Sequence, residues 1–419
     1  MNNFCLKGNI LYAVSPEELR LHPAGTLVCE NGCCAGVFDA VPERYAALPV
    51  HDHGERLIVP GYTDLHLHAP QYENLGLGLD KELLAWLESY TYPAEAAFSD
   101  LAHARTAYAR FTEELRRGFT TRAVIFATTH TPATLFLMEQ LEESGLCSFV
   151  GRVSMDRNCP DTLREPSALI ALEATEDWLS GVAGRFDRTA PILTPRFVPS
   201  CSQALMEGLA SLAELYDLPI QSHISETPEE VLWVRSLHPE CSGYADVYRR
   251  FGLLGPGTVL AHGLYLEEEE IELLRETGTW LAHCPTSNTD LRSGIAPVRR
   301  FLDAGLRLGL GSDIAGGHTL DMAEVLRSAL QVSGLLWRQN GSRPLSPTEA
   351  FFLATRGGGA FFGKTGSFEA GFAFDAVVID DAVWSPPGRY SLRERFERML
   401  YLAAARDVTA KYVAGTRLF

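Results

Sequence analysis

The chain is poor in positive charge. Its 419 residues include 36 Lys and Arg against 53 Asp and Glu, which gives a formal net charge of −17 at pH 7. No run of basic residues is longer than two. Proteins that bind nucleic acids cluster Lys and Arg to neutralise phosphates. We therefore expect no nucleic-acid polymer as a partner, whereas a small ligand stays open.

Long apolar runs are also absent. No stretch reaches the roughly 20 apolar residues of a membrane span, and residues 1–11 lack the apolar centre of a signal peptide. The nine cysteines are odd in number, and Cys29, Cys33 and Cys34 form no CxxC pair. Reduced thiols in a cytoplasmic protein without membrane contact are the expectation.

The signatures of several other enzyme classes are missing or misplaced. There is no G-x-S-x-G elbow of a serine hydrolase. His238-Pro-Glu240 has the letters of one zinc deaminase motif, but no P-C-x-x-C completes it. Residues 358–365 match the phosphate-loop pattern, yet a helical stretch rather than a strand precedes them. These classes are set aside.

Short apolar strands alternate with helical segments over most of the chain. Eight alternating units over roughly 300 residues favour a closed (β/α)8 barrel of the TIM type over an open sheet. Helices are expected at 204–215 and 267–276, among others. The predicted strands end at Leu65-His66, Ile125-Phe126, Val153-Ser154, Leu193-Thr194, Gln221-Ser222, Leu260-Ala261, Leu281-Ala282 and Leu310-Gly311.

The two ends of the chain differ from this pattern. Residues 1–58 and 366–419 contain short strand-like runs and turns, and neither flank is large enough to bury a good core alone. We expect them to pair into one small β-sandwich beside a barrel of residues 59–365.

His66 and His68 form a His-x-His pair at the end of the first barrel strand. Residues i and i+2 of a strand point to the same side, so both imidazoles can reach one metal ion. Barrel enzymes place such residues at the carboxyl ends of their strands. A second pair, His51-Asp52-His53, precedes the strand and is interpreted as a solvated loop.

Four other strand ends carry residue types that bind metals. Three histidines and a carboxylate suit a borderline divalent ion such as zinc and leave a position for water, whose pKa the ion lowers. His283 is interpreted as structural, held by a hydrogen bond to a neighbouring loop. The strand ends concerned carry His223, His262, His283 and Asp313.

Glu226 follows His223 by three residues. A carboxyl group there can take a proton from water and pass it to a leaving group. The alternative is a solvated acid that opens the next helix, before Thr227-Pro228. The long segment 72–95, after the first strand, could cover the site and exclude water.

The motifs resemble the amidohydrolase superfamily. The resemblance covers nearly the whole barrel and rests on Pro60-Gly61-x-x-Asp64-x-His66-x-His68, His223-Ile-Ser-Glu226 and Gly311-Ser-Asp313. Further stretches resemble the branch that deaminates guanine. These are His68-Ala-Pro-Gln71-Tyr72, Trp86-Leu-x-x-Tyr90-Thr-Tyr-Pro-Ala-Glu95, Thr194-Pro-Arg-Phe197, Ser200-Cys-Ser202 and Ala282-His-Cys-Pro-x-Ser-Asn288.

The resemblance implies a role for each matching residue. One Zn²⁺ per chain would be bound by His66, His68, His223 and Asp313. Glu226 would be the general acid/base, with His262 and Asp313 acting on the attacking water. The purine would lie against Gln71, Arg196 and Phe197 and beside His68 and His223. The absence of a Lys at Thr194-Pro-Arg196 favours one metal over two.

The expected reaction is hydrolysis of guanine to xanthine and ammonia, a step of purine catabolism, by a homodimer. One alternative is deamination of a related ring: 8-oxoguanine, another aminopurine, a pterin or an aminotriazine. Another is a barrel that has lost its metal and serves as a binding scaffold, although no ligand of the resemblance is missing.

Overall fold

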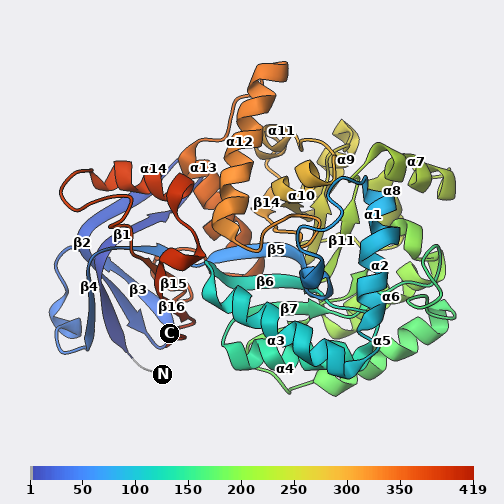
Figure 1. The fold of residues 1–419 in the computed structure, drawn as a ribbon, viewed down its shortest axis with the longest axis horizontal. Coiled ribbons are helices and arrows are strands. Elements are labelled where there is room, and N and C mark those ends of the chain that lie inside the picture. The colour runs from blue at the N-terminus through green and yellow to red at the C-terminus, as the bar shows by residue number, and fades with distance from the viewer. Residues whose placement is uncertain (1–2) are drawn as a thin grey trace.

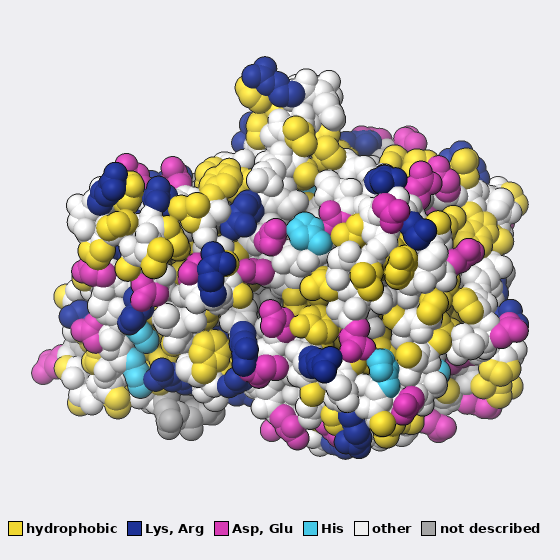
Figure 2. Space-filling view, viewed as in Figure 1, with side chains coloured by type: hydrophobic (Ala, Val, Ile, Leu, Met, Phe, Trp, Pro, Cys, Tyr) yellow, Lys and Arg dark blue, Asp and Glu magenta, His cyan; other side chains and the backbone are white. Residues whose placement is uncertain are grey.

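A computed structural model describes residues 3–419 and contains a barrel beside a β-rich unit (Figure 1). The predicted fold class is confirmed. In the described part of the chain, no helix has the length and apolar character needed to cross a membrane. Figure 2 shows acidic and basic side chains interspersed over one face of the molecule, so this face presents no extended basic area.

Parallel strands surround the barrel axis in sequence order. Hydrogen bonds join the first four and the last four, Leu193 bridges the two groups at Ile220, and the Asp313 N–H donates to the His66 carbonyl to close the ring. The strands are β5 (Tyr62–His68), β6 (Thr120–Phe126), β7 (Cys147–Gly151) continued by β8 (Val153–Ser154), β9 (Thr189–Pro191) continued by β10 (Thr194–Pro195), β11 (Ile220–Ile224), β12 (Thr258–His262), β13 (Trp280–His283) and β14 (Arg307–Leu310).

Helices follow the strands and cover the barrel. The two expected helices are present as α6 and α9, each within one residue of the predicted bounds. Ser202 and Ser167 accept backbone N–H groups at the starts of α6 and α5, as helix-capping serines do. The outer helices are α3 (Leu101–Arg117), α4 (Thr131–Ser144), α5 (Ala168–Val182), α6 (Gln203–Tyr216), α7 (Pro228–Leu237), α8 (Tyr244–Arg250), α9 (Glu268–Thr277), α10 (Pro285–Asp290), α11 (Val298–Asp303), α12 (Met322–Asn340) and α13 (Pro347–Phe352).

The β-rich unit is built from both ends of the chain. Its strands lie in the order β17-β16-β15-β4-β1-β2-β3 within one sheet. Cys33 of edge strand β3 bridges Ala373, just before β15, so the sheet folds back on itself around a core of its own. The strands are β1 (Phe4–Ala13), β2 (Leu19–Glu30), β3 (Cys33–Phe38), β4 (Val50–Pro60), β15 (Ala376–Ile379), β16 (Val408–Val413) and β17 (Thr416–Arg417), and helix α14 (Leu392–Leu402) precedes β16. The domain boundaries at 58/59 and 365/366 stay a prediction.

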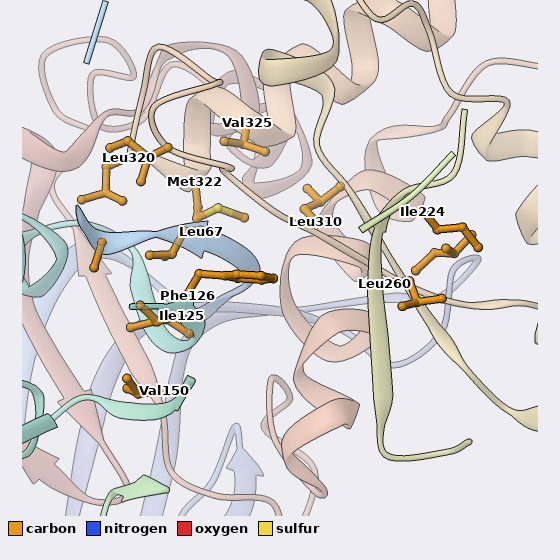
Figure 3. Packing of buried hydrophobic residues seen from close by; sticks show 14 of the residues in the cluster. Leu67, Ile125, Phe126, Val150, Ile224, Leu260, Leu310, Leu320, Met322 and Val325 are labelled. Carbon is orange, nitrogen blue, oxygen red and sulfur yellow. The ribbon is translucent and has the colours of Figure 1, made fainter. Parts of the chain in front are cut away.

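Side-chain alternation lets this sheet serve two cores. On β4, Leu57 and Val59 join the barrel cluster, whereas Ile58 joins the core of the sheet. On β15, Val377 joins the barrel cluster and Ala376 joins the core of the sheet, because successive side chains of a strand point to opposite faces. Figure 3 shows the barrel cluster, in which side chains of β5, β6, β7, β11, β12 and β14 gather with Met322 and Val325 of α12.

One local prediction is wrong. His51-Asp52-His53 lies within β4 rather than in a loop, because its backbone pairs in parallel with β1 from Cys5 to Lys7. The side chains of this half of β4 are partly or fully exposed, and their polarity reflects that exposure rather than a turn.

Candidate active site

The side chains predicted to bind metal converge at the carboxyl ends of β5, β11 and β14. The Asp313 Oδ1 atom lies 3.2 Å from His66 Nε2 and 3.4 Å from His68 Nε2, and the Nε2 atoms of His68 and His223 are 3.1 Å apart. All four residues are buried. The two-residue spacing on β5 therefore aims both imidazoles at one point, as the sequence predicts.

Asp64 fixes the seam between β5 and β14. Its carboxylate accepts the backbone N–H and the hydroxyl of Ser312, at 3.0 Å and 2.6 Å, and the N–H of His66 at 3.2 Å. Burial raises the pKa of this carboxyl to about 6, against the lowering effect of these hydrogen bonds. Because Ser312 precedes Asp313 and Asp64 lies two residues before His66, these hydrogen bonds set the distance between two predicted metal ligands.

These residues fit a single metal ion. His66, His68 and His223 offer ligand atoms that all lie within 4.8 Å of one another, as do those of His66, His262 and Asp313. The buried Nε2 atom of His66 has no hydrogen-bond partner among the described residues, which a metal would satisfy. Burial lowers the pKa of His66, His68 and His223 and so favours the neutral imidazole, the form that binds metals.

A backbone carbonyl group holds one ring nitrogen of His223, a predicted metal ligand. His223 Nδ1 lies 2.6 Å from the carbonyl oxygen of Arg196, so it carries the proton and Nε2 is left free to face the site. This bond also ties the end of β11 to the loop after β10.

Glu226 lies beside this group, at the start of α7. Thr227 and Glu230 form a capping box there, and the Glu230 carboxylate also accepts the Glu226 N–H at 2.7 Å. The Glu226 Oε2 atom is 3.4 Å from His262 Nε2. Burial, followed by the negative charge of Asp313, raises the pKa of Glu226 well above its ordinary value. Burial therefore favours the protonated form of this carboxyl group, which is not the solvated acid of the alternative.

The pKa of Asp313 is shifted in the opposite direction to that of Glu226. Burial alone would raise its pKa, but the imidazoles of His66, His262 and His68 outweigh this effect and hold the pKa well below the ordinary value. Two acids that share one pocket, one protonated and one ionised, can divide the roles of acid and base.

A hydrogen bond with Asn288 orients the His262 ring. Its Nδ1 atom lies 2.9 Å from Asn288 Oδ1, and its Nε2 atom is 3.7 Å from Asp313 Oδ2. His262 and Asp313 have φ values of 81° and 47°, in the left-handed region that non-glycine residues seldom adopt. Such strain is concentrated at functional sites, where the surrounding bonds maintain it.

A pocket with an empty volume of about 400 Å³, including open space at its mouth, joins these groups to the predicted substrate contacts. Gln71, Arg196 and Phe197 are all buried in its wall. The full lining is His68, Gln71, Leu83, Trp86, Leu87, Arg196, Phe197, His223, Glu226, His262, Leu291 and Asp313.

The segment after β5 covers the pocket, as predicted. This segment, residues 69–97, is called the cover. It forms a 3₁₀ helix (Ala69–Asn74), α1 (Leu83–Trp86), a π-helical turn (Leu87–Thr91) and α2 (Tyr92–Ala97), and Figure 1 shows α1 and α2 beside the ends of the barrel strands. Trp86 donates its indole N–H to the Leu77 carbonyl at 3.0 Å, and this hydrogen bond joins α1 to the loop that precedes it. The sequence predicts that this segment covers the site, but it does not predict which of its side chains line the pocket.

Glu95 is the polar residue that the sequence interpretation misses. It is 1% exposed and accepts hydrogen bonds from both Gln71 and Arg196. Its only signal in the sequence is its place in the Trp86 to Glu95 stretch. The acid thus links the cover to two predicted substrate contacts.

His283 lies apart from the site. Its ring lines a separate small cavity with Arg299 and Ser333, and burial lowers its pKa to about 3. The predicted hydrogen bond to a neighbouring loop is wrong, because neither ring nitrogen has a partner among residues 3–419. It is a buried neutral ring.

Comparison with known proteins supports one family. The model of the amidohydrolase family matches residues 57–417. The guanine deaminase of Dictyostelium discoideum is 38% identical over 385 residues, which cover 88% of this chain and 84% of that protein. A crystal structure of guanine deaminase from C. acetobutylicum with bound guanine has a TM-score of 0.97 and 42% identity, with all of both chains covered. The E. coli guanine deaminase structure has a TM-score of 0.90 and 32% identity, with 99% of each chain covered.

Proposed function

The chain belongs to the amidohydrolase family, among the guanine deaminases, and on that premise we propose that it hydrolyses guanine to xanthine and ammonia. The single observation that carries the proposal is the shared pocket. In that pocket, Glu226 and side chains able to bind a metal lie together with Gln71 and Arg196, which can hydrogen-bond a purine.

We propose that His66, His68, His223 and Asp313 hold one Zn²⁺ per chain. Three imidazoles and one carboxylate match the ligand preference of zinc, and the bound ion would supply a water activated as a nucleophile near neutral pH. The family is typically metal-dependent, and the convergence of the imidazoles supports this assignment.

The chain's own acids move the protons. As water adds to carbon 2, Glu226 donates its proton to ring nitrogen 3, and Asp313 with His262 accepts the proton that the water loses. The hydroxyl group on carbon 2 then gives its proton to Glu226, while Asp313 passes its proton to the amino group. The amino group leaves as ammonia and carbon 2 becomes a carbonyl, so guanine and water give xanthine and ammonia and both acids return to their starting states. The opposite pKa shifts of Glu226 and Asp313 support this division of roles.

The remaining pocket residues hold the base. Arg196 donates to a ring carbonyl oxygen, and Phe197 offers a flat face for stacking. His68 and His223 line the same pocket, so the ring lies against them on the metal side. Leu83, Trp86 and Leu87 of the cover exclude water, which strengthens each charge interaction inside.

The test is the substitution Glu226→Gln. It keeps the shape of the side chain but removes the proton-transferring group, so we expect kcat to fall by about 10²-fold to 10⁴-fold. Zinc content, measured by mass spectrometry, stays at one per chain. Glu229→Gln is the matched control, because Glu229 is exposed in α7, the helix that follows Glu226.

Assays use ammonia release and the loss of guanine absorbance. Wild-type activity in Glu226→Gln would refute the assignment. Preferential release of ammonia from 8-oxoguanine, a pterin or an aminotriazine would replace guanine by that ring. Purified protein that binds no zinc and turns over none of these compounds would favour the binding scaffold.

We propose a cytoplasmic homodimer for the assembled enzyme. All nine cysteines are free thiols, which suits a reducing compartment. The dimer is expected from the family resemblance, and light scattering of the purified protein tests it. A single-chain mass would exclude it.

A further inference from the structure

Glu95 lies between two residues that face the substrate. Its Oε1 atom accepts from Gln71 Nε2 at 2.9 Å and from Arg196 Nη1 at 2.8 Å, and its Oε2 atom accepts from the same Arg196 nitrogen at 2.7 Å. The three residues come from three separate segments, and none is more than 3% exposed. Tyr92 adds a ring 5.5 Å from the Arg196 guanidinium.

The chemistry of a carboxylate fixes the Gln71 amide. An ionised carboxylate only accepts hydrogen bonds, so it selects the amide orientation that turns the Gln71 nitrogen toward Glu95. The Gln71 carbonyl oxygen is left without a protein donor among the described residues. Because Gln71 lines the pocket, this oxygen is an acceptor available to the ligand.

The same carboxylate bonds to only one of the three nitrogens of the Arg196 guanidinium. Nη1 gives its hydrogens to Glu95, whereas Nε and Nη2 have no acceptor within residues 3–419 and remain donors for the pocket. The attraction of Glu95 raises the pKa of Arg196 in spite of burial, so the donor side stays charged. One wall of the pocket thus presents an acceptor beside a donor.

We infer that Glu95 sets the hydrogen-bond polarity of this wall, so that the pocket selects a ring amide, an N–H next to a C=O. Gln71 accepts from the ring N–H, and Arg196 donates to the ring oxygen. Guanine carries such an edge at nitrogen 1 and carbon 6. The inference rests on the proposed function and assigns Glu95 as a positioning residue, because it acts through Gln71 and Arg196.

Two analogues with the same amino group at carbon 2 test the polarity. 2-Aminopurine lacks both the N–H and the oxygen of the edge, and 2,6-diaminopurine presents a donor where guanine presents the oxygen. A site that hydrogen-bonds its substrate rejects such analogues by about 10⁴-fold in kcat/KM, and we expect this from the wild type.

The variant is Glu95→Gln. The new amide can donate as well as accept, so Gln71 can turn its nitrogen to the pocket and the polarity is no longer fixed. We expect the preference for guanine over 2,6-diaminopurine to narrow at least tenfold, with zinc content unchanged. Glu88→Gln is the control, because Glu88 is exposed on the same cover segment.

The exchange Gln71→Glu with Glu95→Gln supplies a rescue. It returns a carboxylate oxygen to the pocket as acceptor, so the guanine preference recovers relative to Glu95→Gln alone. This double variant also decides the matter if the single variant does not fold.

An equal loss of activity toward all three bases in Glu95→Gln, with no recovery in the exchange, would show that Glu95 only folds the cover and would overturn the inference. A wild type that prefers 2-aminopurine or leaves guanine intact would instead overturn the proposed function.

Discussion

Lys411→Met tests how the β-rich sheet is fastened to the barrel. Lys411 is a fully buried amine in β16. Its Nζ atom donates to the carbonyl oxygens of Arg116 at 2.6 Å and Thr120 at 2.9 Å, with that of Leu115 at 3.5 Å. Arg116 and Leu115 lie in the last turn of α3, where carbonyl groups have no partner within the helix. Met fills a similar volume but donates nothing.

The magnitude follows from the two short bonds. A buried acceptor that loses its donor costs about 1–3 kcal/mol, so two cost about 2–6 kcal/mol. Removing a buried amine offsets part of this loss, and we expect the free energy of unfolding to fall by about 3 kcal/mol. Urea unfolding monitored by circular dichroism measures it. Lys7→Met is the control, because Lys7 is exposed on β1 of the same sheet and its change stays within about 0.5 kcal/mol.

The pH dependence of the free energy of unfolding gives a second test of Lys411. Burial, helped by the charge of Arg116, lowers the pKa of Lys411 well below its ordinary value in the folded protein. Between that pKa and the unfolded value of about 10.4, the unfolded chain binds more protons, so the contribution of Lys411 to stability increases as pH rises. The difference between wild type and Lys411→Met therefore grows from pH 7 to 9.5. Equal stability of the two proteins, or a difference that shrinks with pH, would refute this reasoning.

Three further outcomes are expected. Removing the metal with a chelator abolishes ammonia release, and added zinc restores it; activity that survives at zero metal content contradicts the proposed centre. Trp86→Ala opens the cover and raises KM for guanine roughly tenfold with zinc retained, as kinetics measure; an unchanged KM contradicts a closed cover. Asp375→Asn leaves the buried Arg122 without its partner at 2.6 Å and lowers the free energy of unfolding by about 3 kcal/mol in urea, whereas Asp380→Asn, in a half-exposed pair, has little effect.

The convergence of the four predicted metal ligands was predictable because it follows from local geometry. His66 and His68 share one side of a strand, and the carboxyl ends of parallel strands meet at one face of a barrel. His223 and Asp313 therefore reach the same point although they are far apart in the chain. The fold class was predictable for the same reason, since it depends on a repeated pattern rather than on single contacts.

Contacts made by irregular segments were not predictable. Glu95 lies 24 residues after Gln71 and 101 before Arg196, and only the folded path of the cover brings the three together. His51 and His53 were misassigned because backbone pairing with β1, and not side-chain polarity, makes that stretch a strand. His283 looked like a ligand or a bonded residue, but its surroundings depend on how α11 and α12 pack.

The position of β4 between β1 and β15 has a consequence for synthesis of the protein. On the ribosome, β1 and β4 emerge before the barrel, whereas β15 and β16 emerge after it. One edge of β4 therefore keeps unpaired N–H and C=O groups until translation is nearly finished, and such edges attract other chains. Lys411 also reaches the carboxyl end of α3 only then. A chain that ends before residue 376 would leave this edge of β4 without its partner β15, and an unpaired strand edge promotes aggregation.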